Sequence, residues 1–136
     1  MIAKTKRGDA ERAAEWALVN NYGCVNTVRA VKTKYQRQDL FASDVIGKDQ
    51  YGEMVFCQVT TGKKEALRQR RKKLEKIPWQ LSDTVLVFQM DFIQEGRSKK
   101  WFFNVFEYVI RCRLRGWLEY PLIDIKKEWF KAYRKD

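Results

Sequence analysis

Residues 39–62, DLFASDVIGKDQYGEMVFCQVTTG, predict a β-hairpin around which the rest of the chain is organised. Residues 41–48 form the first expected strand, and residues 48–52 are turn material that ends in a glycine. Residues 53–61 form the second strand, which is rich in β-branched and apolar side chains. The stretch therefore predicts two paired strands in the middle of the fold.

Three polar residues of this hairpin form a candidate site. Side chains alternate between the faces of a strand, so Gln58 and Thr60 share one face of the second strand. Asp44 lies on the first strand, and the hairpin folds it back toward Gln58. We expect a carboxylate, an amide and a hydroxyl group to meet at one edge of a sheet. The alternative is a strand-end acid paired with a lysine, beside two residues of a half-buried polar face.

The composition indicates one globular domain. The chain has 136 residues, of which 45% are hydrophobic and 14% aromatic, enough for a real core. No apolar run approaches a membrane span, and the basic start of the chain shows no secretory signal. The three cysteines, Cys24, Cys57 and Cys112, lack CxxC spacing, so we expect reduced thiols in a cytoplasmic protein.

The chain contains no histidine, which limits its chemistry. Ser-His-Asp triads, Cys-His dyads and the usual zinc sites all require that residue. A metal ion bound here would be a hard cation with oxygen ligands, such as Mg²⁺ or Mn²⁺.

The charge balance suggests a polyanionic partner. Lysine and arginine number 28 against 17 acidic residues, a formal net charge of +11. Residues 63–76 form an expected helix with eight basic and two acidic residues, a net of +6. Such a run would suit contact with phosphates, and nucleic acid is the favoured partner. The alternative is a basic surface that serves solubility.

The remaining stretches predict helices on both sides of one sheet. A helix should begin at Asp9 as its N-cap and end near Gly23 as its C′ residue. The other expected elements are a basic arm (1–7), a strand (24–31), a loop (32–38), a strand (83–92), a loop (93–100), an edge strand containing Pro121 (117–125) and a basic helix (126–135).

Residues 101–115 are ambiguous. Their aromatic and β-branched content favours a strand. Their periodicity favours a helix, which we prefer, because one polar face would collect Asn104, Glu107, Tyr108, Arg111 and Arg115.

The order of these elements resembles the PD-(D/E)xK nuclease superfamily, and within it the archaeal-type Holliday junction resolvases and their phage relatives. The segments that carry the resemblance are KRGDAER near the start and SDVIGKDQYGEMVFCQVTTG in the hairpin. The resemblance covers residues 7–92. It implies a single α/β domain with a mixed central β-sheet flanked by helices and a restriction-endonuclease-like core in the order αβββαβ. Residues 8–92 would form this core, and residues 93–136 an aromatic and basic extension of the same domain.

The resemblance assigns roles to four positions. Asp44 matches the metal-binding aspartate of the family, and Gln58 falls where the family has aspartate or glutamate. Thr60 falls where the family has lysine. Glu11 matches the glutamate of the first helix, with Glu15 as a second choice, although spacing alone favours two solvated glutamates.

Two of these positions depart from the family pattern. The carbonyl of Gln58 can bind Mg²⁺ but brings no negative charge, which would weaken affinity. Thr60 cannot replace a lysine that stabilises charge on the phosphate. Lys63 or Lys64, just beyond the strand, could take the place of that lysine, and Asp39 could add the missing carboxylate.

The resemblance implies Mg²⁺- or Mn²⁺-dependent hydrolysis of phosphodiester bonds in DNA, by an endonuclease or by a junction resolvase that would act as a homodimer. The alternatives are a catalytically degenerate nuclease fold that binds DNA or a protein without cleavage, and a basic protein that assembles through its aromatic C-terminal region. Trp79 or Trp101, if exposed, could stack on an unpaired base. The expected nucleic-acid contacts are Lys63, Lys64, Arg68, Arg70, Arg71, Lys72, Lys73, Arg111, Arg113 and Arg115.

Overall fold

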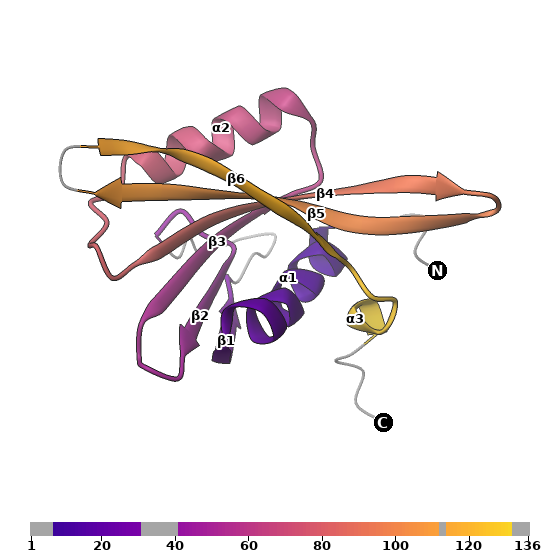
Figure 1. Ribbon diagram of the computed structural model, residues 1–136, viewed down its shortest axis with the longest axis horizontal. Helices are drawn as coiled ribbons and strands as arrows, with labels where there is room; N and C mark the ends of the chain where they lie inside the picture. The colour runs from indigo at the N-terminus through magenta and orange to yellow at the C-terminus, as the bar shows by residue number, and fades with distance from the viewer. Residues whose placement is uncertain (1–6, 31–40, 112–113, 132–136) are drawn as a thin grey trace, which may run out of the picture.

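The computed structural model describes residues 7–30, 41–111 and 114–131 (Figure 1). The elements within these residues are α1 (Arg7–Tyr22), β1 (Cys24–Arg29), β2 (Val45–Asp49), β3 (Met54–Thr60), α2 (Lys64–Glu75), β4 (Thr84–Glu95), β5 (Ser98–Arg111), β6 (Leu114–Asp124) and α3 (Glu128–Lys131).

The strands of the described residues form one six-stranded sheet in the order β1-β2-β3-β4-β5-β6. The β3–β4 pair is parallel, because α2 crosses over between these strands, and the other neighbouring pairs are antiparallel. The fold is therefore mixed α/β, as expected. In the central hairpin, Val45 pairs with Cys57 and Ile46 with Phe56, so the predicted strand pairing is confirmed.

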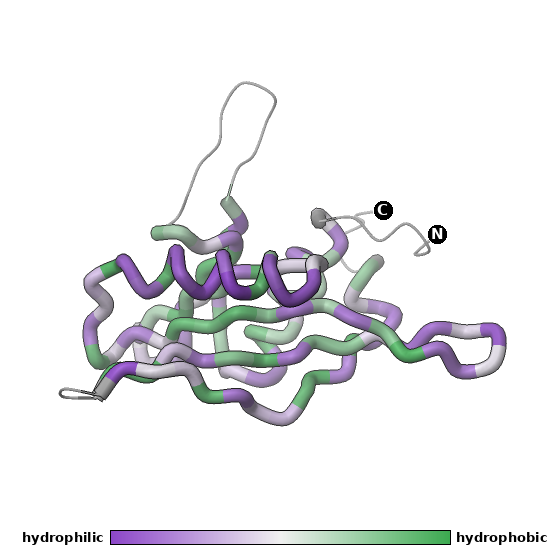
Figure 2. Tube along the Cα trace, turned by 90° about the horizontal axis from the view of Figure 1, so that it is seen from above, coloured by the Kyte–Doolittle hydropathy of each residue, from purple (hydrophilic) through white to green (hydrophobic). Residues whose placement is uncertain are grey.

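The helices cover opposite faces of the sheet (Figure 1). The core on the α1 side includes Ala13, Ala14, Ala17, Val45, Cys57, Val59, Phe88 and Phe103. The core on the α2 side includes Ile46, Phe56, Leu67, Leu74, Trp79, Val85, Val87 and Phe106. Figure 2 shows α2 as a largely hydrophilic helix lying across more hydrophobic strands. Central strands are thus buried on both faces.

Small residues let α1 lie close to the sheet. Ala10, Ala13, Ala14 and Ala17 are all fully buried beneath the helix. The helix ends as predicted, with Gly23 in the left-handed region at a φ of +69°.

The helix preferred for residues 101–115 is wrong, because this segment forms most of β5. Its side chains face both cores: Phe103 and Val105 lie on the α1 side, and Phe106 and Tyr108 on the α2 side. A strand buried on both faces shows no strict alternation of polar and apolar residues, so the polar positions imitated a helical face.

The polar loop predicted for residues 93–100 is also wrong. β4 continues to Glu95 and turns at Gly96, with a φ of +60°, so that Glu95 pairs with Ser98. This end of the β4–β5 hairpin extends beyond the other strands (Figure 1). The edge strand expected over residues 117–125 is confirmed by β6, which carries Pro121 at the open edge of the sheet.

Some expectations fall outside the described residues. They are the arm before residue 7, the loop at 32–38 and residues 132–135 of the helix expected over 126–135, within which α3 begins at Glu128. None of the helices in the described ranges is long and apolar enough to cross a membrane.

Candidate functional site

Asp44 lies between β1 and β3, immediately before β2. Its main-chain N–H donates to the carbonyl of Cys57 at 2.9 Å, and its own carbonyl accepts from the N–H of Ala30 at 2.8 Å. Its carboxylate is 2% exposed, and Oδ2 accepts a 2.8 Å hydrogen bond from the main-chain N–H of Val59. The Asp44 carboxylate therefore extends the hydrogen bonding along β3 beyond the first residue of β2.

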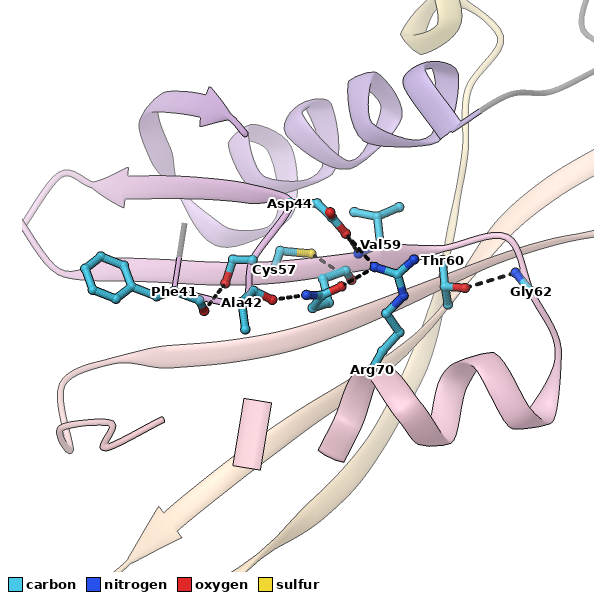
Figure 3. Close-up of polar contacts among 10 residues, drawn as sticks. Phe41, Ala42, Asp44, Cys57, Val59, Thr60, Gly62 and Arg70 are labelled. Atoms are coloured by element: carbon cyan, nitrogen blue, oxygen red, sulfur yellow. Dashed lines mark hydrogen bonds and ion pairs between the residues drawn. The ribbon is translucent and has the colours of Figure 1, made fainter. Parts of the chain in front are cut away.

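Gln58 faces the α2 side and is 1% exposed. Its amide group is used at both ends: Nε2 donates to the carbonyl of Ala42, and Oε1 accepts a 2.7 Å hydrogen bond from Nη1 of Arg70. The same Arg70 nitrogen lies 3.6 Å from Oδ2 of Asp44. The expected meeting of Asp44 and Gln58 thus has a guanidinium at its centre (Figure 3).

Sequence reasoning placed Arg70 among the nucleic-acid contacts and missed its place at the site. The spacing along the helix indicates this position, because Arg70 lies three residues after Leu67 and four before Leu74. These are the two buried leucines of α2. Residues at these spacings share one side of a helix. A cation on the side that faces the sheet must find acidic or amide partners there.

Thr60 closes the turn that follows β3. Its Oγ1 accepts a 3.0 Å hydrogen bond from the N–H of Gly62, and the side chain of Gln89 donates to the carbonyl of Gly62 at 2.9 Å. A Cβ at Gly62 would lie 2.5 Å from the Cβ of Ala66, so the turn requires glycine. Lys63 and Lys64 have exposed side chains, and the cation that contacts Asp44 and Gln58 is Arg70.

Glu11 and Glu15 lie on α1, which covers the opposite face of the sheet. The interpretation of both as solvated glutamates is wrong, since each is buried. Glu15 accepts from Oγ1 of Thr27 at 2.8 Å and pairs with Nε of Arg29 at 3.3 Å, which anchors α1 to β1. Asp39 lies outside the described residues.

The described residues form no ready-made cluster for a divalent metal ion. Mg²⁺ requires a near-octahedral set of oxygen ligands, usually with carboxylates among them. Among the residues that the structure describes, no three Asp, Glu, Cys or His side chains are grouped so that they could hold an ion. The nearest oxygens of Asp44 and Gln58 face the guanidinium of Arg70 instead.

The two buried thiols of the α1-side core, Cys24 and Cys57, are not poised as nucleophiles. Burial, and after it the charge of Asp44, raise the pKa of the Cys57 thiol well above its usual value. Burial, and after it the charge of Asp49, raise the pKa of Cys24 to about 11. Only a thiolate attacks or binds metal effectively, so the raised pKa values disfavour reaction of these two thiols near neutral pH.

The outer side of α2 is a basic surface, which we call the α2 basic surface. Its exposed side chains are Lys63, Lys64, Arg68, Lys72, Lys73 and Lys76. Arg71 differs, because its guanidinium lies 5.0 Å from the ring centre of Phe106 and 5.7 Å from that of Trp117. This contact holds α2 against β5 and β6. Arg115 is exposed on β6, while Arg113 and the side chain of Arg111 lie outside the described part.

The two tryptophans considered for base stacking have partners within the fold. Trp79 is buried and donates to the carbonyl of Leu74 at 2.7 Å. Trp101 is partly buried and its ring contacts those of Phe92 and Phe130.

Comparisons with known protein families, with curated proteins and with solved structures found no match for this chain.

Proposed function

We propose that this chain is a nucleic-acid-binding protein with a nuclease-like core, and that it holds a phosphate backbone along the α2 basic surface. The observation that carries the proposal is the position of this surface. The helix that presents it on its outer side also sends Arg70 from its inner side into the Asp44–Gln58 site, so the surface and the site share one helix. Phosphate contacts by lysine and arginine supply most sequence-independent affinity for nucleic acid.

The chain order supports the resemblance to PD-(D/E)xK nucleases. The order from α1 to β4 is αβββαβ, with Asp44 before β2 and Gln58 and Thr60 on β3. These are the elements on which the resemblance places its site residues.

Binding without cleavage is the version that this geometry favours. Arg70 neutralises the buried Asp44 carboxylate and takes up the oxygen of Gln58. The charge of this guanidinium is thus used by Asp44, at the place where the family has a metal ion and a lysine, and the exposed α2 basic surface supplies the phosphate contacts.

Phosphodiester hydrolysis with Mg²⁺ or Mn²⁺ is the second candidate. It is favoured by one observation, the convergence of a carboxylate, an amide oxygen and a cation at the end of β3. It would require Arg70 to leave the two oxygens so that they become available as ligands.

Binding is tested by two matched pairs of lysines. We expect Lys72→Ala with Lys73→Ala, on α2, to weaken DNA binding and to reduce the dependence of log K on log salt by about 1–2. Lys126→Ala with Lys127→Ala removes the same charge next to α3, on the other side of the sheet, and should have a smaller effect. Equal losses in the two double variants would show that only net charge matters.

Cleavage is tested on labelled linear, nicked, single-stranded and four-way-junction DNA with Mg²⁺ or Mn²⁺. Binding without cleavage predicts intact DNA on every substrate. Metal-dependent cutting that Asp44→Ala abolishes would establish the second candidate instead and would rank its substrates.

A further inference from the structure

Two consecutive residues before the site have an unusual backbone. Phe41 and Ala42 have φ values of 53° and 57°, in the left-handed region that favours glycine. For a bulky side chain such as phenylalanine this conformation is an outlier. Residues held in such conformations persist only where surrounding contacts fix them, and they gather at ligand-binding sites.

The contacts that fix this backbone belong to the candidate site. The side chain of Gln58 donates to the carbonyl of Ala42, and Oγ of Ser43 donates to the carbonyl of Phe41 at 3.2 Å. Ala42 is itself buried in the α2-side core. Gln58 therefore holds Arg70 with one end of its amide group and the Phe41–Ala42 backbone with the other.

This backbone turns the ring of Phe41 outward. The side chain is 62% exposed, and its ring meets that of Phe56 edge-on, with centres 5.8 Å apart and planes at 85°. Phe56 is in turn supported by Trp79, at 4.7 Å between ring centres. In Figure 3 Phe41 lies at one end of the site and Gly62 at the other, with Arg70 between them.

We propose that Phe41 is a stacking platform for an unpaired base of DNA. The inference rests on the proposed function, since the strand would be held through its phosphates by the α2 basic surface. Every base presents a flat aromatic face, and non-specific single-strand binding combines such exposed rings with a basic track. Bases inside a duplex are already stacked on their neighbours. The substrate class is therefore DNA with unpaired bases, either single-stranded or branched.

The test compares Phe41→Leu with Tyr51→Leu. Leucine keeps apolar bulk but cannot stack, and Tyr51 is a matched aromatic control, 80% exposed on the β2–β3 turn. Affinities are measured by fluorescence anisotropy on a labelled single strand and on the matching blunt duplex. We expect Phe41→Leu to lose roughly five- to hundredfold on the single strand, the range for stacking one base. We expect duplex affinity to stay the same, and Tyr51→Leu to change neither.

The fluorescence of a 2-aminopurine base in the single strand reports directly whether that base stacks on the protein. Its emission should change on binding to the wild-type protein and to Phe41→Trp, and should not change with Phe41→Leu. Equal affinity of Phe41→Leu and wild type for the single strand, or equal losses on both DNAs, would overturn the stacking role while leaving the proposed function in place. A wild-type protein that binds no DNA would overturn both.

Discussion

Nη1 of Arg70 donates a 2.7 Å hydrogen bond to Oε1 of Gln58 while lying 3.6 Å from Oδ2 of Asp44. One cation from α2 thus serves two buried acceptors, one just before β2 and one on β3, although the arginine itself keeps some exposure. Removing the guanidinium would leave the Asp44 carboxylate with less compensation for its burial. We expect Arg70→Met to lower the free energy of unfolding by about 2 kcal/mol, as measured by urea denaturation.

A neighbouring arginine provides the control for this prediction. Arg68, on the same helix, pairs with Glu65 at 2.6 Å with both side chains exposed, and Arg68→Met should leave stability unchanged. In a double-mutant cycle, Asp44→Asn should reduce the cost of Arg70→Met. A cycle that shows no coupling between these two residues would mean that the contact contributes nothing to stability.

Gly47 of β2 lies against Cys24 at the start of β1. A Cβ at this position would lie 2.5 Å from Sγ of Cys24 and 3.4 Å from Cδ1 of Leu18. We expect Gly47→Ala to destabilise the fold by about 1–3 kcal/mol, because the α1-side core has no room for it. Adding Cys24→Ala should recover part of the loss. Gly116→Ala is the control, since nothing lies within 4 Å of its Cβ position.

The central part of the fold was predictable because its signals are local. The hairpin, the glycine at the end of α1 and the basic helix before Pro78 each depend on a few adjacent residues. β5 was not predictable in this way. Whether its side chains face helices on both sides depends on the whole sheet, and burial on both faces removes the alternation that identifies a strand.

The position of the candidate site could be predicted from the sequence, but not all of the residues that form it. Strand alternation and hairpin folding bring Asp44 and Gln58 together without knowledge of the helices. The partner that they share, Arg70, comes from α2, and its position depends on how that helix packs on the sheet. The left-handed backbone of Phe41 and Ala42 gave no signal either, because neither residue is glycine, asparagine or aspartate.

The buried thiols predict how stability depends on pH. Burial raises the pKa of Cys24 from 9.0 in the unfolded chain to about 11 in the folded protein. Between these values the unfolded state has lost the proton that the folded state keeps, so rising pH favours unfolding. We expect the contribution of Cys24 to the free energy of unfolding to be constant near neutral pH and to fall as the pH rises from 9 toward 11. Cys57, with a raised pKa, acts in the same direction.

Denaturation by urea at a series of pH values checks this prediction. Cys24→Ala removes one of the titrating groups, so its stability should fall less steeply over the same range. Thiol labelling gives a second measurement, in which Cys24 and Cys57 should react with a maleimide at neutral pH only after unfolding. Rapid labelling of either thiol in the folded protein would contradict the burial on which the prediction depends.

Substitution of Glu15 tests whether this residue has a structural role on α1 or a role at the candidate site. Its carboxylate accepts from Thr27 and pairs with Arg29, both on β1. Glu15→Gln keeps an acceptor for Thr27 but loses the charge that faces Arg29, so we expect a loss of about 1–2 kcal/mol in the free energy of unfolding. Thr27→Val should destabilise in the same direction, because it removes the hydroxyl donor. DNA binding by folded Glu15→Gln should match the wild type. A variant that kept its stability but lost binding or cleavage would instead place Glu15 at the site, as the resemblance allowed.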